Sequence, residues 1–330
     1  MGDMKVKMRI SERQGNKLLI SLKEIVKPSE LNYILKNLWK FRWHYIMILP
    51  GIVLLFLFAY MPIMGVQIAF KEYDLTAGIW KSPWIGLKNF YFLQDPYFWH
   101  TVKNTLAITI YRLMFGFPIP IIFALLLNEV RNEKFKKAIQ TVSYLPHFVS
   151  WIVVAYILTS MLALDTGVVN FILEKLGFSQ IFFLGEPKYF RAIVVISAIW
   201  KEMGWSSIIY LAALANINPE LYEAALIDGA GRFARIRYIT IPGIMPTVGI
   251  ILILSMPGLL SAGYEQIYPL VNPANMSVSE VLDIYIIRLG LVNAQYSISA
   301  AIGLILGIVQ MLLVLTVNFL IKKSGGVGLW

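Results

Sequence analysis

The 330-residue sequence contains no cysteine and few charged residues, and each shortage excludes a class of protein. Without cysteine, a disulfide-stapled secreted scaffold is impossible. Charged residues make up 15% of the chain, whereas soluble domains have about 25%, so they are too few to coat the two domains that the length would suggest. The chain is also too apolar for disorder, since 58% of its residues are hydrophobic. The composition therefore indicates a membrane protein with several spans.

Catalytic and nucleotide-binding motifs are missing as well. The sequence has no GxxxxGK(S/T), HExxH or GxSxG segment. Its three histidines, at positions 44, 100 and 147, fall in separate regions, so a metal site, a bound cofactor and a membrane enzyme are not expected. A channel is not expected either, because neither a re-entrant filter nor a ring of like charges is apparent.

Six apolar stretches are each long enough to cross a bilayer as a helix, which takes about 20 residues. None shows the alternation of a membrane β-barrel strand, so an all-α fold with six transmembrane helices is predicted. The expected spans are 45–70, 106–127, 138–164, 192–218, 238–264 and 289–321. Several prolines predict broken or kinked spans. They are Pro118, Pro120, Pro146, Pro246 and Pro257.

The net charge of +10 encodes orientation. Most of the 29 lysines and arginines lie before the first span, in the loops after the second and fourth spans, and in the tail, so the positive-inside rule places both termini in the cytoplasm. A nucleic-acid partner is therefore not expected. Residues 1–42 form a basic cytoplasmic segment, either an interfacial helix or a mobile tail. Residues 43–322 form the six-span domain, and 323–330 form the C-terminal tail.

The loop 216–242, between the fourth and fifth spans, carries the most specific pattern. Asn218 is a good N-cap and Pro219 suits the first helical position. Gly229 and Gly231 are expected to bend or end that helix, and a second short helix follows until Ile241-Pro242 stops it. Two short helices with a glycine elbow form a compact element that suits docking into a groove on another protein.

This loop resembles the EAA motif of binding-protein-dependent ABC import permeases, the type I importer fold. The match comprises Glu223-Ala224-Ala225, then Gly229, Ile239 and Ile241-Pro242 at the family's spacing, with Ile241 where Leu is usual. Further stretches resemble the Lpl-type branch, which includes importers of alginate and rhamnogalacturonan fragments. They include MPIMGVQIAFKEYD (61–74), YLPHFVSW (144–151), WKEMGWSSIIYLAAL (200–214) and YEQIYPL (264–270).

The resemblance implies a permease subunit in the cell membrane that is not itself an enzyme. Its partners would be a second permease subunit, two ATP-binding subunits that hold ATP and Mg, an external solute-binding protein and an oligosaccharide. An importer of another solute, such as a peptide or amino acid, is the alternative. The residues expected to couple the loop to the ATPase are Glu223, Ala224, Ala225, Asp228, Gly229, Ile239 and Pro242.

Polar and aromatic residues inside the spans are candidates for a translocation path, because intramembrane ionisable groups are costly. They are Arg112, Trp200, Lys201, Glu202, Trp205 and Tyr210. Structural pairing between helices is the alternative for Arg112 and for the adjacent pair Lys201-Glu202. Neighbours on a helix diverge by about 100°, so these two are not expected to face one partner, and at least one should reach another span. Tyr264, Glu265 and Gln266 are expected at the outer mouth.

Overall fold

A computed structural model describes residues 36–37 and 39–330. This part of the chain is helices and connecting loops, and its one β feature is an isolated antiparallel bridge between Lys71 and Trp84. The segment predicted for 1–42 lies largely outside the described residues. The chain divides into two compact units, residues 1–65 and 66–330, which are described separately.

The first unit contains one long apolar helix. Helix α3 (Arg42–Leu55) continues through the π-helical turn η1 (Phe56–Tyr60) into the 3-10 segment η2 (Met61–Phe70), which crosses the boundary between the units. None of the residues of α3 and η1 is buried. A helix that is apolar on every side and not covered by protein is typical of a segment surrounded by lipid or by another membrane subunit.

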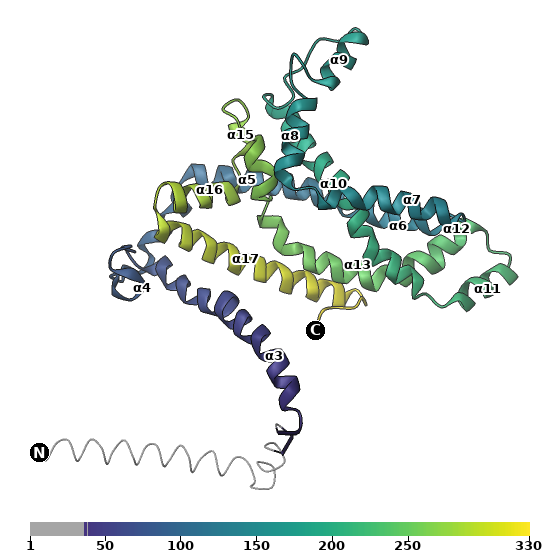
Figure 1. The fold of residues 1–330 in the computed structure, drawn as a ribbon, viewed down its shortest axis with the longest axis horizontal. Helices are drawn as coiled ribbons and strands as arrows, with labels where there is room; N and C mark the ends of the chain where they lie inside the picture. The colour runs from purple at the N-terminus through teal and green to yellow at the C-terminus, as the bar shows by residue number, and fades with distance from the viewer. Residues whose placement is uncertain (1–35, 38) are drawn as a thin grey trace, which may run out of the picture. The chain divides into compact units, whose positions relative to one another are not determined.

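The second unit consists of helices of very different lengths (Figure 1). In its first half they are α4 (Gly78–Lys81), η3 (Gly86–Gln94), α5 (Pro96–Tyr111), η4 (Arg112–Gly116), α6 (Pro118–Asn128), α7 (Glu133–Tyr144), η5 (Leu145–Phe148), α8 (Trp151–Met161) and α9 (Val168–Lys175). In its second half they are α10 (Pro187–Ala215), α11 (Pro219–Ile227), α12 (Arg232–Arg235), η6 (Ile236–Thr240), α13 (Ile241–Ser255), η7 (Met256–Leu260), α14 (Tyr264–Ile267), η8 (Tyr268–Leu270), α15 (Met276–Ser279), α16 (Leu282–Ile287), η9 (Arg288–Val292) and α17 (Tyr296–Lys323).

Five helices among the described residues are long and apolar enough to cross a membrane, and a sixth span is broken. The five are Arg42–Phe70, Pro96–Asn128, Pro187–Ala215, Arg232–Leu260 and Tyr296–Lys323. The predicted third span is instead the pair Glu133–Phe148 and Trp151–Met161, which meet at 99°. The break follows Pro146, and Ser150 begins the new helix by accepting a bond from the Val153 N–H at 3.4 Å. The predicted proline break is thus confirmed here.

Span limits differ where polar residues are buried. The second span begins at Pro96, ten residues before the predicted start, because Thr101, Asn104 and Thr105 are buried and hydrogen-bonded inside the protein. Hydropathy counts such residues as solvent-seeking, although a satisfied polar group can lie within a helix bundle.

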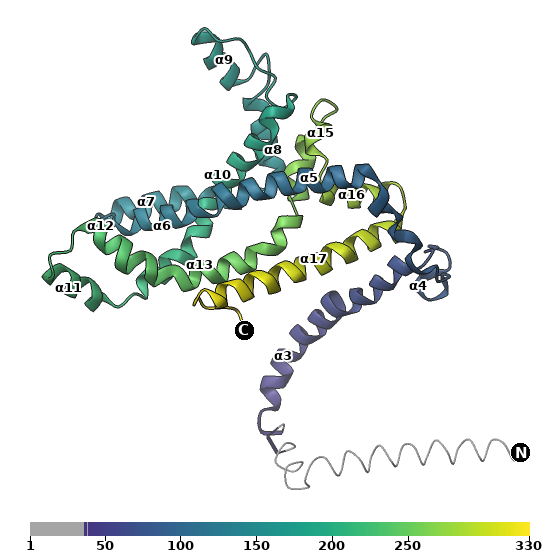
Figure 2. The ribbon, with the colours of Figure 1, turned by 180° about the vertical axis from the view of Figure 1, so that it is seen from behind.

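Helix α10 forms the centre of the second unit, since it contacts α5, α6, α7 and α13. Figures 1 and 2 both show α13 beside α17, α12 near the turn between α6 and α7, and α11 farther out at one end of the second unit. Three apolar clusters hold these helices together, the largest around Phe190 and Val194 of α10. The packing leaves room for a cavity between α10 and its neighbours.

Candidate functional site

A cavity of about 620 Å³ lies among the spans of the second unit. Residues from four spans and from the segment 261–266 line it, and most of them are apolar. Three residues predicted for the translocation path lie on its wall, namely Arg112, Glu202 and Tyr210. The three residues predicted for the outer mouth, Tyr264, Glu265 and Gln266, line it as well. The structure therefore brings these six residues into one site.

Gln266 holds Arg112 at the cavity wall and is itself hydrogen-bonded to α10. Gln266, which is 2% exposed, donates from Nε2 to the Val194 carbonyl at 2.7 Å and to Ser197 Oγ at 2.9 Å. Its Oε1 then accepts from Nη2 of Arg112. Nε of Arg112 is buried without a hydrogen-bond partner among the described residues. The guanidinium is thus held in place and keeps an unused donor. Arg112 also begins the π-helical turn η4, a feature frequent at functional sites.

Lys201 and Glu202 converge on one residue, His147. Lys201 Nζ donates to the His147 carbonyl at 2.5 Å and lies 3.4 Å from Glu202 Oε1, while Glu202 Oε2 lies 2.8 Å from His147 Nδ1. The prediction that these neighbours would not face one partner was wrong, because both side chains are long and His147 offers a carbonyl and a ring nitrogen beside the break. The expected pairing with another span is confirmed.

Lys201 lies behind the cavity rather than on its wall. It is 4% exposed, and its ammonium lies 5.3 Å from the centre of the Trp151 ring. The lysine therefore fastens the broken span to α10. Glu202 also lines the cavity, so the contacts among Lys201, Glu202 and His147 lie next to the cavity wall.

The three aromatic residues predicted for the path lie in different settings. Tyr210 is 2% exposed and lines the cavity. Trp205 stacks on the His147 ring, with centroids 4.5 Å apart and planes 2° apart. Trp200 lines a second cavity of about 400 Å³. Of the three, Tyr210 is the one that lines the larger cavity, where Trp151, which was not predicted, also lies.

Replacing Lys201 with methionine is expected to lower stability. Methionine preserves length and apolar packing but leaves the His147 carbonyl without its donor. We expect a loss of about 1–2 kcal/mol, less than for a fully buried ion pair because the Glu202 side chain is 38% exposed. The thermal midpoint of the purified chain measures the effect. Lys188→Met, at an exposed ion pair on the same helix, is the control, and equal shifts in the two variants would contradict the fastening role.

The loop 216–242, here named the coupling loop after the role predicted for it, contains the predicted first helix, α11 (Pro219–Ile227). Asn218 caps it by accepting a bond from the Glu220 N–H at 3.1 Å. No residue of α11 is buried, and Glu223, Ala224 and Asp228 are exposed. Ala225 is half-buried. An exposed, capped helix offers a firm surface to another protein.

Gly229 ends α11 in the left-handed conformation, with φ of +76°. The Gly229 N–H bonds to the Leu226 carbonyl at 3.1 Å and the Ala230 N–H bonds to the Ala225 carbonyl at 2.8 Å, which together form a Schellman motif. A side chain at 229 would meet nothing within 4 Å. The requirement for glycine is therefore conformational, and it sets the direction in which the chain leaves the helix.

The second helix of the loop does not stop at Ile241-Pro242 as predicted. It continues from Arg232 through η6 into α13, with Ile239 half-buried in the π turn and Pro242 exposed in the first turn of α13. In the π turn the Ile241 N–H already bonds to the Ile236 carbonyl, so the α-helical ladder is interrupted just before the proline, whose missing N–H then costs little.

Two contacts connect the coupling loop to the spans. Tyr222 of α11 bonds through its hydroxyl to Thr240 Oγ1 at 3.0 Å, and Thr240 is buried. Arg232 pairs with Glu129 at the end of α6, with Nε 2.5 Å from Oε2. The loop is therefore connected to the fifth span through α11 and to the second span through Arg232.

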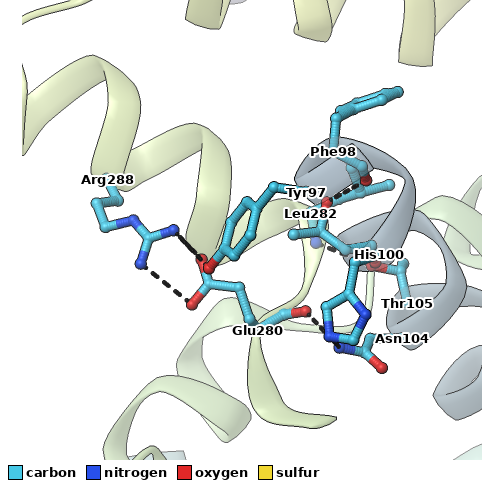
Figure 3. Close-up of polar contacts among 9 residues, drawn as sticks. Tyr97, Phe98, His100, Asn104, Thr105, Glu280, Leu282 and Arg288 are labelled. Atoms are coloured by element: carbon cyan, nitrogen blue, oxygen red, sulfur yellow. Dashed lines mark hydrogen bonds and ion pairs between the residues drawn. The ribbon is translucent and has the colours of Figure 1, made fainter. Parts of the chain in front are cut away.

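A polar cluster at the start of α5 was not foreseen (Figure 3). Glu280, 1% exposed, pairs with Arg288 at 2.7 Å, and Arg288 donates to the Tyr97 hydroxyl at 3.0 Å. Asn104 donates to the Glu280 carbonyl at 3.1 Å. Burial raises the pKa of Glu280, and the nearby Arg288 and His100 oppose the rise. The cluster fastens the α15–α16 segment to α5, and its parts are too far apart in sequence to form a local motif.

No group of three or more His, Asp or Glu residues is placed to hold a metal ion within residues 36–37 and 39–330.

Residues 116–323 match the family model described as "Binding-protein-dependent transport system inner membrane component". Two relatives come from Bacillus subtilis (strain 168). Protein LplB is 43% identical over 290 residues, covering 88% of this chain and 91% of that protein. The polygalacturonan/rhamnogalacturonan transport system permease protein YteP is 41% identical, covering 93% of this chain and 96% of its own length.

Two solved structures are also similar. One is a bacterial ABC transporter involved in the import of the acidic polysaccharide alginate, with a TM-score of 0.82, 40% identity, and coverage of 88% of this chain and 99% of that chain. The other is a bacterial alginate ABC transporter in complex with an alginate pentasaccharide-bound periplasmic protein, with a TM-score of 0.82 and 39% identity over 89% of this chain and 99% of that chain.

Proposed function

The chain belongs to the binding-protein-dependent transport system inner membrane components and is the membrane permease of an ABC importer for a sugar or polysaccharide, and on that premise we propose that its cavity passes oligosaccharides or polysaccharide fragments. The observation that carries the proposal is the cavity itself. It combines apolar and aromatic walls with a few fixed polar groups, a composition common to small-molecule sites.

Sugars are bound by aromatic faces and by hydrogen bonds to their hydroxyl groups, and this wall supplies both. Tyr264 and Trp151, both partly exposed, provide the rings, and Arg112 provides a guanidinium whose position is set by Gln266. A guanidinium also suits a uronate carboxylate. The same wall carries two acidic residues, Glu202 and Glu265, so the cavity is not positively charged throughout. Recognition of a uronate carboxylate would therefore rest on Arg112.

The coupling loop would transmit the ATPase cycle. In this proposal two ATP-binding subunits hold ATP and Mg, and Glu223, Ala224, Ala225, Asp228 and Gly229 dock into one of them. Because Tyr222 bonds to Thr240 in η6 and Arg232 pairs with Glu129 at the end of α6, movement of the loop on ATP-driven closure would rock the fifth and second spans between outward and inward access. Ile239 and Pro242 would set the join between the loop and α13. Both termini would lie in the cytoplasm.

A second permease subunit would complete the cavity, and an external solute-binding protein would deliver the sugar. This assembly follows from the proposed class of importer, and the alginate transporter with its bound periplasmic protein supports the binding-protein partner. Selection among sugars would then be shared between the binding protein and the cavity.

Uptake of a panel of neutral and uronate oligosaccharides by the complete importer in liposomes tests the proposal. We expect ATP-dependent uptake of at least one oligosaccharide. We expect Arg112→Gln to reduce uronate uptake about fivefold, since glutamine keeps a donor but loses the charge, worth about 1 kcal/mol. Lys188→Gln is the control, because Lys188 is exposed and away from the cavity.

The alternative solutes are distinguished in the same assay. Uptake of peptides or amino acids without any oligosaccharide would contradict the sugar assignment. Unchanged uronate uptake by Arg112→Gln would contradict the role of Arg112 while leaving the sugar assignment in place.

A further inference from the structure

The second cavity is an apolar groove of about 400 Å³ between α6, α7 and α10. Its lining is Phe123, Ala138, Ile139, Val142, Ser143, Pro146, Trp200 and Met203. The hydroxyl of Ser143 is bonded to the Ile139 carbonyl at 2.7 Å, and the indole N–H of Trp200 is the other polar side-chain group on an otherwise apolar lining. The groove therefore suits a hydrocarbon chain better than a sugar or a peptide.

Helix α7 places this groove about one helical turn from a cluster of positively charged residues. Ala138, Ile139 and Val142 form one face of α7, and Phe135, 58% exposed, continues that face one turn earlier. Lys134 lies one turn before Ala138, about 6 Å along the axis. The groove thus runs from a charged end of the helix toward the interior of the bundle.

The charged end carries more positive charge than its surroundings neutralise. Arg131, Lys134, Lys136 and Lys137 lie within seven residues, and none of them pairs with a carboxylate in the described part of the chain. Glu133 is the acid within this run, and Glu129 is engaged with Arg232. These cations follow the end of α6, which is where a span reaches the membrane surface.

An apolar groove that begins beside unpaired cations at a membrane surface complements an anionic amphiphile. The groove suits its hydrocarbon chain and the cations suit its head group. We infer that the groove binds an anionic phospholipid, with an acyl chain against Trp200, Ile139 and Val142 and the phosphate near Lys134, while Lys136 adds positive charge on the other side of the same helical face. Lysine stems pack along apolar surface while their ammonium groups reach the phosphate. Basic residues at the membrane surface attract anionic lipids. The inference does not depend on which solute the larger cavity passes.

Trp200 serves as a local reporter of the acyl chain. The assembled importer is placed in nanodiscs that contain either brominated phosphatidylglycerol or brominated phosphatidylcholine, and the Trp200 signal is the difference between the wild type and Trp200→Phe. We expect half-quenching of that signal at about a tenfold lower mole fraction of the anionic lipid.

A comparison of two double lysine variants distinguishes a specific lipid site from a general effect of positive charge. We expect the double variant Lys134→Gln/Lys136→Gln to lose the preference for phosphatidylglycerol. The matched control Lys322→Gln/Lys323→Gln removes the same charge from the end of α17 and should retain the preference. Ala138→Phe, which fills the groove without adding a second indole, should remove quenching of the Trp200 signal by both lipids.

Three outcomes would overturn the inference. Equal quenching by the two lipids would mean that the groove takes any lipid. Absence of quenching in the assembled importer would mean that a protein subunit covers it. Loss of the phosphatidylglycerol preference in both double lysine variants would mean that the overall positive charge of the protein at the membrane surface causes the preference.

Discussion

Gly229→Asp is expected to reduce solute uptake by the assembled importer about tenfold or more while leaving the chain folded and inserted in the membrane. The residue occupies a left-handed conformation, with φ of +76°, that costs a residue with a side chain about 1–2 kcal/mol. No atom lies within 4 Å of the added Cβ, so the cost is confined to the elbow. The backbone at residue 229 would no longer hold α11 in the orientation in which it docks. The substitution would also add a carboxylate at the exposed end of α11.

Gly231→Asp is the matched control for this variant. It adds the same charge two residues further on, at a position with φ of −66° and nothing within 4 Å. Gly231 is the N-cap of α12, where aspartate is favoured. Uptake and ATPase stimulation should therefore remain within about twofold of the wild type. Wild-type ATPase stimulation in a purified Gly229→Asp complex would contradict the coupling role of the loop.

Gly204→Ala is expected to destabilise the chain by about 3 kcal/mol, although alanine is normally the better helix former. A Cβ at 204 would lie 2.1 Å from the Ser143 carbonyl oxygen, which belongs to the backbone of α7 and cannot turn aside. Helices α7 and α10 would have to separate, and the broken third span would lose its support. We expect the thermal midpoint of the purified chain to fall by roughly 5 °C or more.

Gly303→Ala tests whether that loss comes from close packing. Gly303 lies in the long helix α17, and an added Cβ would meet nothing within 4 Å. The substitution should leave the thermal midpoint unchanged or raise it, because helix propensity is the remaining effect. A similar fall in both variants would contradict the contact between α7 and α10 at Gly204.

The sequence alone predicted the spans well, because apolar length is a local property. Its errors lie where tertiary contacts satisfy groups that hydropathy treats as polar or disruptive. Asn104 and Thr105 extend the second span because other segments bond to them. Pro242 does not end a helix, because the π turn before it has already interrupted the ladder.

The candidate site divides in the same way. The coupling loop could be located from its motif, since the cap at Asn218 and the glycine at 229 act within one helix. The cavity could not be located in this way, because Arg112 and Gln266 are 154 residues apart and meet through the packing of their helices. Lys201 and Trp200 were chosen for their chemistry, but helix rotation directs them away from the larger cavity.

What the sequence by itself determined is therefore the class of the protein, its spans and the capped helix α11, since each depends on residues close together along the chain. The tertiary structure decided which intramembrane polar groups share a cavity, that Lys201 and Glu202 both reach His147, and that the third span breaks at 99°. These features depend on how helices rotate and approach one another. Close contacts such as that of Gly204 with Ser143 set those rotations, and no single segment encodes them.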